Sequence, residues 1–592
     1  MPPHPCSVLL WRTALLGCFL GIVATVYFIA GYNGYLRFPL LNAAAGVSVL
    51  LAALYFFYLF VLQLRQRSRL TLALWLLILG VLLTQIALGL VPPWARDELT
   101  HHLAIPRLYL LAGRIHEIPF APYSYYPMLL DMLYAPFVLW EWDFVPKLVH
   151  GLFGVLTGLL LHAYLGRRLS PVYGLMGFFF YVTTPAVLRL MNWAYVDLGL
   201  VFFAMASLLC LLRWHETGEI RWLLVSGISA GFTLATKPNG MLVCLLLGFI
   251  LIFLRARVRP RAALNTLAWA GLFTLLALVP FAPWAVKNAM QTGNPFFPAF
   301  QGLFAGAGGG EGGGVGGGLG IWTTRELLYG ERWWEIIALP LRIFFFGRDN
   351  SAQHFDGVLN PILLLFLPWT FKGKWTEDKK VFFGFALLYF LYAFVLVDMR
   401  IRYILPIVPP LVILLVYGIH NLYMEIRRPA LLIGTVLLLV AWNGFYLVRY
   451  VQTVSPLGVL SGHESREAFL TRMVPDYGAF RYINGNLPGD ARIYFIFMGR
   501  RGYYCHRDYF HDSGDYPGLL LRTIRRAQGA QEVADSLRKR GLTHLLLRED
   551  LLGRFLQNNL NPDKQRLWQA FAQSHLQLLF REGRYSVYSL HG

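Results

Sequence analysis

Long apolar stretches recur between residues 8 and 450, and they constrain the fold more than any other feature of the sequence. A helix needs about 20 apolar residues to cross the hydrocarbon core of a bilayer, and fewer where neighbouring protein covers it. Thirteen stretches meet this criterion: residues 8–30, 41–63, 70–91, 146–165, 171–189, 195–213, 222–236, 241–254, 263–283, 357–371, 381–398, 403–424 and 430–450. The sequence therefore predicts a mainly α-helical, polytopic membrane bundle of about 13 transmembrane helices.

Basic residues cluster in alternate loops between these stretches. A net charge of +20 would by itself allow a nucleic-acid-binding protein, but 57% of the residues are hydrophobic and only 14% are charged, as in membrane proteins. Short loops rich in Lys and Arg face the cytoplasm, and here they hold Arg65, Arg67, Arg69, Arg167, Arg168, Arg213, Arg221, Arg255, Arg257, Arg259, Arg261, Lys372, Lys374, Lys379, Lys380, Arg427 and Arg428. We therefore expect a multi-pass protein of the plasma (inner) membrane, with a cytoplasmic N-terminus and no nucleic-acid partner.

The loops on the opposite face are long. They comprise residues 92–145 and 284–356, and the tail that follows the last apolar stretch joins them outside the cytoplasm. The tail alternates strand-like runs with a helical pattern at 531–540; the runs are 491–498, 542–547, 576–580 and 585–590. The sequence thus predicts a transmembrane domain at 1–451 and a soluble, extracytoplasmic α/β domain at 452–592.

Three segments depart from these patterns. Lys237-Pro238-Asn239-Gly240 separates two short apolar stretches and indicates a broken or re-entrant turn. Gly306–Gly320 is nearly all glycine and lacks the ending of a phosphate-binding loop, so we interpret it as a flexible linker, with a mobile lid as the alternative. Cys505–Asp515 matches no strong metal-site template, so a polar surface loop is favoured over a metal site.

Ionisable residues gather at the predicted outer ends of the apolar stretches. Asp97 and Glu98, followed by His102, could be acid/base groups or metal ligands, or part of a solvated loop. Asp197 lies so close to lipid that it has to face protein or a wet cavity. Lys237 and the pair Arg400 and Arg402 add cations, which could form a shared site or only anchor helices by snorkelling. Because such anchors belong mostly on the cytoplasmic side, we favour a shared site.

A family resemblance runs through these same residues. The segment Asp97–Tyr109, continued to Tyr125-Tyr126-Pro127, resembles the first outer loop of bacterial GT-C glycosyltransferases, the dolichyl-phosphate-mannose protein mannosyltransferase-like and aminoarabinose transferase-like enzymes. Further matches are Tyr195-Val196-Asp197, Thr236–Gly240, Trp284–Asn288, Gly293–Pro298 and Arg400–Tyr403. The likeness covers roughly residues 70–450. The chain departs from the family in having an extra pair of helices before the Asp97-Glu98 loop.

The resemblance implies a substrate, an activity and roles for individual residues. The donor would be a sugar on a polyprenyl phosphate, used on the outer face without nucleotide, and the acceptor a hydroxyl of a protein, lipid or glycan. Asp97 and Glu98 would be catalytic, with Asp97 as the general base of an inverting displacement, and Lys237, Arg400 and Arg402 would bind the donor phosphate. His102, Asp197, Tyr195 and Asn288 would form an acceptor or secondary site. No cofactor is certain, but some members use a divalent cation, which Asp97, Glu98 and His102 could hold.

Two other classes of protein fit part of the sequence. Charged residues in a helical bundle also mark the pathways of transporters and lipid flippases. Transporters usually contain repeated halves with broken helices at the bilayer midplane, whereas this chain shows no internal repeat and its polar residues cluster at one interface. A non-catalytic member whose tail binds a partner is a third reading, and the presence of Asp97 argues against it. The sequence therefore favours the transferase.

The alternating basic loops generate a prediction about sidedness. In a background without the five native cysteines, a cysteine at Ser513 is expected to react with a membrane-impermeant thiol reagent in intact spheroplasts. A cysteine at Arg257 is expected to react only after the membrane is opened. Labelling of Arg257→Cys but not Ser513→Cys in intact cells would reverse the predicted orientation.

Overall fold

In the computed structural model, the described residues are 4–64, 68–258, 263–304, 321–396, 399–426, 429–514 and 517–591. The predicted linker or lid at Gly306–Gly320 lies outside them, as do Asp398, Asp515 and several residues of the basic loops (Arg65, Arg67, Arg259, Arg261, Arg427 and Arg428). The chain forms two compact units. The helical unit comprises residues 1–91, 113–115 and 126–460, and the C-terminal unit comprises 92–112, 116–125 and 461–592.

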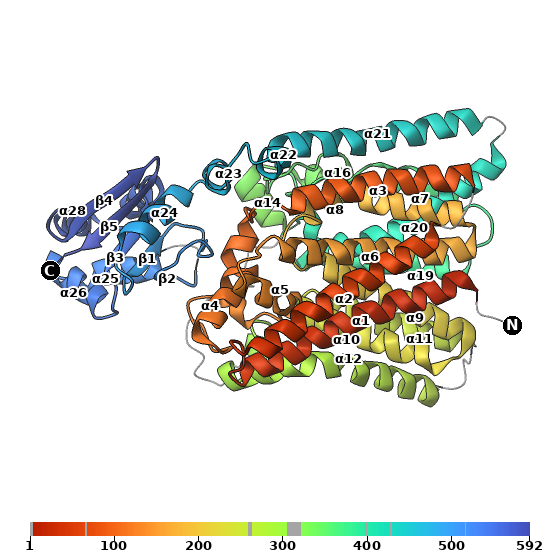
Figure 1. Cartoon of the computed structure of the whole chain (residues 1–592), viewed down its shortest axis with the longest axis horizontal. Coiled ribbons are helices and arrows are strands. Elements are labelled where there is room, and N and C mark those ends of the chain that lie inside the picture. Colours follow the sequence, from red (N-terminus) through yellow and green to blue (C-terminus); the bar gives the residue numbers. More distant parts are fainter. Residues whose placement is uncertain are drawn as a thin grey trace. The chain divides into compact units, whose positions relative to one another are not determined.

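Long apolar helices make up the helical unit, which confirms the predicted mainly α-helical membrane fold. In the described part of the chain, nine helices are long and apolar enough to cross a membrane, and three shorter apolar helices accompany them. The nine are α1 (Pro5–Tyr32), α2 (Pro39–Gln63), α3 (Arg69–Gly89), α6 (Val145–Arg168), α9 (Asp197–Thr217), α11 (Gly240–Val258), α12 (Ala263–Thr292), α20 (Val408–Glu425) and α21 (Pro429–Val454). A further long helix, α19, spans Glu377–Leu396. In Figure 1, helices α1, α2, α3, α6, α12 and α21 run roughly lengthwise through this unit.

Shorter elements complete the helical unit. They are α5 (Leu129–Leu139), α7 (Pro171–Thr183), α8 (Pro185–Leu190), α10 (Ile220–Thr236), α13 (Gln301–Phe304), α14 (Ile321–Tyr329), α15 (Trp333–Ile337), α16 (Leu339–Phe345), α17 (Ile362–Leu365), α18 (Leu367–Thr370), η3 (Ile401–Tyr403), η4 (Leu405–Ile407) and α22 (Pro456–Leu460). The predicted helix at 357–371 is wrong as a single element, since that segment holds only α17 and α18. Pro361 and Pro368 explain the interruption, because proline cannot continue a helical hydrogen-bond ladder.

Small residues let neighbouring helices of this unit approach closely. A Cβ added at Gly231 of α10 would lie 2.4 Å from the carbonyl oxygen of Ala277 in α12, and one added at Gly227 would lie 2.6 Å from the Cβ of Leu276. Within a bilayer, packing of this kind replaces the hydrophobic driving force between helices. The glycines of α10 therefore fix its position against α12.

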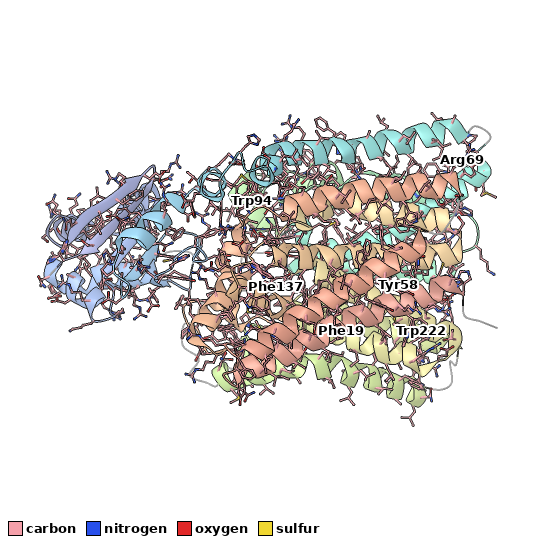
Figure 2. All side chains as sticks on the ribbon, viewed as in Figure 1. Phe19, Tyr58, Arg69, Trp94, Phe137 and Trp222 are labelled. Atoms are coloured by element: carbon pink, nitrogen blue, oxygen red, sulfur yellow. The ribbon has the colours of Figure 1, made fainter. Side chains whose placement is uncertain are left out.

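The two ends of the helical unit differ in chemistry. Figure 2 places Arg69, at the start of α3, and Trp222, near the start of α10, at the same end of the unit. At a rise of 1.5 Å per residue, α10 carries the chain about 22 Å from Trp222 to Lys237. Lys237 and the residues around it therefore lie at the end away from the basic loops at Arg69 and Arg221.

A five-stranded sheet organises the C-terminal unit. Its strands are β1 (Arg492–Ile496), β2 (Asp508–His511), β3 (His544–Arg548), β4 (Leu576–Glu582) and β5 (Tyr585–Leu590), in the order β2-β1-β3-β5-β4. β1 is parallel to β2 and β3, while β5 is antiparallel to β3 and β4. The predicted α/β fold of the tail is confirmed; among its strands, the prediction missed β2.

Helices cover both faces of this sheet. They are α23 (Arg466–Met473), α24 (Tyr477–Asn486), α25 (Gly518–Arg526), α26 (Ala530–Arg538), α27 (Glu549–Asn559) and α28 (Pro562–His575). Tyr494 and Ile496 of β1 join a buried cluster with α25, α26 and α28. Phe495, which points to the other face, contacts Phe480 of α24 with ring centroids 5.8 Å apart. This alternation is the period of two that a strand imposes.

Residues 92–112 and 116–125, in the loop predicted to be the first outer one, belong to the C-terminal unit. The loop contains η1 (Glu98–His102), α4 (Ala104–Ala112) and η2 (Pro122–Tyr125). The carbonyl oxygen of Leu99 accepts hydrogen bonds from the N–H groups of Gly502 and Tyr503 at 3.0 and 3.2 Å, and the hydroxyl of Tyr504 donates to the carbonyl oxygen of Pro93 at 2.6 Å. These contacts hold the segment that contains Asp97 against the tail of the chain.

Candidate functional site

A buried ion pair joins the start of α9 to the end of α10. Asp197 is the first residue of α9 and is 1% exposed. Lys237 directly follows α10, which ends there because Pro238 disfavours helical backbone at the preceding residue. The Nζ of Lys237 donates to Oδ1 of Asp197 at 2.6 Å. A carboxylate is stabilised at this position because it faces the positive end of the helix dipole.

The second oxygen of Asp197 has a different environment. Oδ2 is buried and has no hydrogen-bond partner among the described residues. A buried acceptor without a partner costs about 1–3 kcal/mol. The carboxylate can therefore accept one more donor, such as a hydroxyl group, without losing its bond to Lys237.

Arg402 adds a second cation to this pair. Its guanidinium lies 5.7 Å from the ring centroid of Tyr195 and 5.1 Å from that of Tyr403, and Nη2 donates to the Tyr403 hydroxyl at 3.3 Å. The Nζ of Lys237 lies 5.1 Å from the same Tyr403 ring, and both cations act electrostatically on Asp197. We call these five residues, Asp197, Lys237, Arg402, Tyr195 and Tyr403, the cation cluster. It holds two cations and one carboxylate, so its charge is net positive.

Polar side chains that the sequence analysis missed support the backbone next to the cluster. Nε2 of His150 accepts from the N–H of Leu198 at 2.9 Å, so Nδ1 carries the proton and faces the carbonyl oxygen of Trp193 at 2.7 Å. The hydroxyl of Tyr134 donates to the carbonyl oxygen of Tyr195 at 2.5 Å. His150 therefore fixes the segment that leads into Asp197. The sequence did indicate His150, because this histidine lies in an otherwise apolar stretch, three residues after Lys147.

The loop of the C-terminal unit holds the predicted acid pair. Glu98 is fully buried, and its Oε2 accepts from the N–H groups of Trp94 and Ala95 at 2.9 and 2.8 Å. Asp97, half-buried, precedes η1. His102 is buried, with its ring centroid 4.1 Å from that of His101. Glu98 thus holds the turn before η1, whereas the carboxylate of Asp97 makes no such hydrogen bond to the helix start.

The remaining predicted residues lie in the helical unit. Arg400 is half-buried and directly precedes η3, two residues before Arg402. Asn288 is buried on α12 and donates from Nδ2 to the carbonyl oxygen of Phe297 at 3.1 Å. The structure therefore brings together Asp197, Lys237, Tyr195 and Arg402, and separately Asp97, Glu98 and His102.

Metal-binding residues do not gather in the described part of the chain. No group of three or more His, Cys, Asp or Glu side chains there is arranged to hold a metal ion. In the tail, burial raises the pKa of Cys505 to about 11, and its thiol donates to the carbonyl oxygen of Arg507. Cys505 is therefore a buried thiol rather than a thiolate ligand.

A family model matches part of the chain, and solved structures have a similar fold. A family model described as dolichyl-phosphate-mannose-protein mannosyltransferase matches residues 142–286, the region that contains Asp197 and Lys237. No curated protein matches the chain. The family resemblance therefore rests on this local match and on the fold.

Solved structures share that fold. ArnT from Cupriavidus metallidurans in the apo state aligns with a TM-score of 0.53 at 15% identity, over 87% of this chain and 97% of that one. ArnT from the same organism bound to undecaprenyl phosphate aligns with a TM-score of 0.51 at 14% identity, over the same shares of the two chains. The chain thus shares the multi-pass fold of these structures.

The position of Glu98 generates a prediction about hydrogen exchange. Glu98→Ala would leave the partly buried N–H of Trp94 and the buried N–H of Ala95 without their acceptor, at a cost of about 1–3 kcal/mol for a buried group. The backbone amides of residues 94–103 are therefore expected to exchange about tenfold faster or more, measured by mass spectrometry on the full chain. The exposed Glu467, in the same unit, provides the control variant Glu467→Ala. Unchanged exchange in Glu98→Ala would mean that the carboxylate does not hold this turn.

Proposed function

We propose that this chain is a membrane glycosyltransferase that moves a sugar from a polyprenyl-phosphate donor to an acceptor hydroxyl on the outer face of the plasma membrane. The fold shared with ArnT, one of whose structures is bound to undecaprenyl phosphate, supports the proposal. So does the family match over residues 142–286. In this proposal the N-terminus faces the cytoplasm and the C-terminal unit lies outside it.

The cation cluster is the observation that carries the proposal. A polyprenyl tail stays in the bilayer, so the phosphate must be bound by cations at the end of a helical bundle. Lys237 and Arg402 lie at such an end, beside two tyrosine rings, and their charges exceed that of Asp197. As the sugar leaves, the phosphate gains negative charge, which fixed cations stabilise more than the starting ester. Arg400 is proposed to contribute the third cation.

The reaction we propose is a single in-line displacement. The acceptor oxygen attacks the anomeric carbon, the bond from that carbon to the phosphate oxygen breaks, and polyprenyl phosphate leaves with the electron pair. The acceptor proton passes to Asp97, the proposed general base. The configuration at the anomeric carbon is therefore inverted. Glu98 supports this step by holding the turn next to Asp97, and His102 and Asn288 are proposed to orient the acceptor.

Removal of the cations is expected to weaken binding of polyprenyl phosphate. Arg400→Gln and Arg402→Gln are each expected to cost about 1.5–3 kcal/mol, or roughly tenfold to a hundredfold in Kd, because charge-assisted hydrogen bonds are lost. Binding of a synthetic polyprenyl phosphate to the purified full chain in detergent measures this. Lys372→Ala removes an exposed cation of the same unit and serves as the control.

Lys237 needs a different variant, because removing it leaves the buried carboxylate of Asp197 without a cation. Breaking a buried ion pair in this way destabilises a protein by roughly 3–5 kcal/mol. The double variant Asp197→Asn with Lys237→Met removes both charges and keeps similar volumes. It is expected to fold and to bind polyprenyl phosphate weakly. Binding equal to wild type in this variant and in both arginine variants would mean that the cations only anchor helices.

Asp97→Asn tests the proposed base. The amide keeps the shape of the carboxylate but cannot accept the proton, so turnover is expected to fall about 10²–10⁴-fold while donor binding is unchanged. The assay is sugar transfer from synthetic polyprenyl-phosphate donors to a cell-envelope extract, with Asp490→Asn, an exposed position in the same unit, as the control. Equal transfer by Asp97→Asn and wild type would remove Asp97 from the mechanism. If wild type transfers no sugar but moves the lipid across liposomes, the chain is a flippase.

A further inference from the structure

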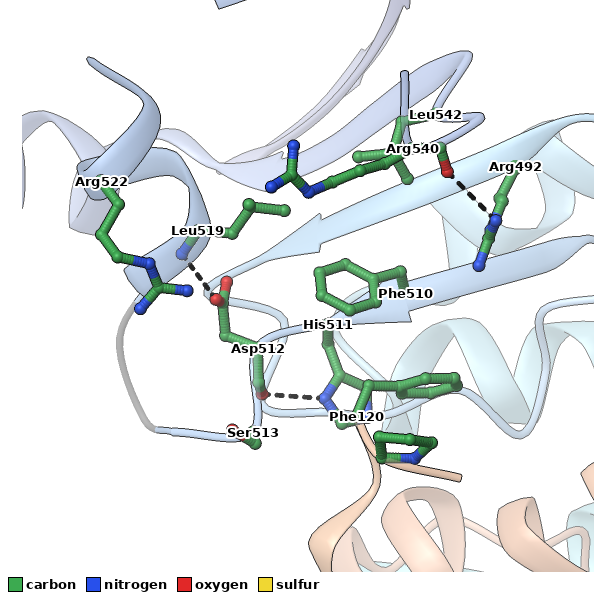
Figure 3. A pocket seen from close by; sticks show the side chains of 11 residues that line it. Phe120, Arg492, Phe510, His511, Asp512, Ser513, Leu519, Arg522, Arg540 and Leu542 are labelled. Atoms are coloured by element: carbon green, nitrogen blue, oxygen red, sulfur yellow. Dashed lines mark hydrogen bonds between the residues drawn. The ribbon is translucent and has the colours of Figure 1, made fainter. Parts of the chain in front are cut away.

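A pocket in the C-terminal unit is distinct from the residues assigned above. It has a volume of about 460 Å³ and lies beside β1, β2 and α25 (Figure 3). Three arginines line it: Arg492 at the start of β1, Arg522 on α25 and Arg540 just after α26. They come from three segments of the chain, so the fold, rather than a run of basic sequence, brings them to one pocket.

Among the described residues, two of these arginines form hydrogen bonds that do not neutralise their positive charge. Nη1 of Arg492 donates to the carbonyl oxygen of Arg540 at 3.1 Å, and Nη1 of Arg540 donates to the carbonyl oxygen of Ser536 at 2.8 Å. Both acceptors are neutral. The side chain of Arg522 is exposed.

One carboxylate, that of Asp512, also lines the pocket, but both of its oxygens are occupied. Oδ1 accepts from the N–H of Leu519 at 2.7 Å, and Oδ2 accepts from the hydroxyl of Tyr494. Burial lowers the pKa of the neighbouring His511 to about 4, so its ring is neutral at pH 7. The described side chains that line the pocket therefore carry a net positive charge at neutral pH.

Aromatic side chains give the pocket an apolar wall. The ring of Phe120 lies 5.8 Å from that of Phe510 and 5.1 Å from that of His511, edge to face in both cases. Ligand pockets of this size typically combine apolar surface with a few polar groups that orient the ligand. An aromatic face packs against the C–H groups of a sugar ring, while guanidinium groups bind carboxylate or phosphate oxygens in pairs.

We propose that this pocket binds a sugar that carries a phosphate or carboxylate group. Arg492, Arg522 and Arg540 hold the anionic group, and Phe120 and Phe510 contact the ring. The shared chemistry of sugar phosphates and uronic acids is a negative group on a pyranose, and the volume of the pocket suits one or two such rings. The inference rests on this pocket alone and does not require the proposed transferase activity.

Calorimetric titration of the purified full chain tests the proposal with four probes: glucose 6-phosphate, glucuronate, glucose and inorganic phosphate. At least one of the two anionic sugars is expected to bind, more tightly than inorganic phosphate, and glucose is expected not to bind. Comparing the affinities of glucose 6-phosphate and glucuronate shows whether the pocket prefers a phosphate or a carboxylate group. Arg522→Gln is expected to weaken binding about tenfold or more, because a charge-assisted contact is lost.

Two matched variants locate the binding. Arg526→Gln removes the same charge from the same helix, but Arg526 does not line the pocket, so its affinity should equal that of wild type. Arg402→Gln, in the cation cluster, should also keep the affinity. The proposal is overturned if neither anionic sugar binds, or if inorganic phosphate binds as tightly as both sugars. It is also overturned if Arg522→Gln and Arg526→Gln weaken sugar binding equally, or if Arg402→Gln is the only variant that weakens it.

Discussion

A carboxylate inside an apolar helical bundle is tolerable only next to a cation, and Asp197 meets this constraint through Lys237. Lys237 forms this pair at the point where α10 ends, directly after Thr236. Pro238 stops α10, and Gly240 permits the reversal, because a Cβ there would lie 2.1 Å from the carbonyl oxygen of Thr233. The bond from His150 to Leu198 then fixes the start of α9. The turn at residues 237–240 thus determines the position of the Lys237 ammonium group in the bundle.

Much of the fold followed from hydropathy. Eleven of the thirteen predicted apolar stretches contain one helix that matches them closely, such as 430–450 against α21, because burial in lipid requires a continuous apolar run. The first exception, 357–371, has the composition of a membrane helix, but its prolines divide it. The second, 171–189, divides at Pro185 into α7 and α8. In the tail, β2 was missed because Asp508-Tyr509-Phe510-His511 is short and polar at both ends; it is defined by its pairing with β1.

The candidate site was only partly predictable. Asp197 and Lys237 were recognisable because ionisable residues are costly in apolar surroundings, and the structure joins them. The role of Glu98 was not recognisable. Its carboxylate binds the N–H groups of residues three and four positions earlier, and the sequence does not distinguish such a carboxylate from a catalytic one. Lys147 was overlooked because its partner, the carbonyl oxygen of Val91 at 2.7 Å, is distant in sequence. The association of the 92–112 loop with the tail also depends on contacts between distant residues, such as Tyr504 with Pro93.

The central claim is that the cation cluster receives the phosphate of a lipid-linked sugar. The most direct test identifies the lipids that copurify with the full chain by mass spectrometry, with the Asp197→Asn and Lys237→Met double variant purified in parallel. The account predicts polyprenyl phosphate or its sugar ester in the wild-type sample, enriched over the membrane extract and depleted in the variant. Bulk phospholipids alone, or polyprenyl lipids at equal levels in both samples, would contradict it.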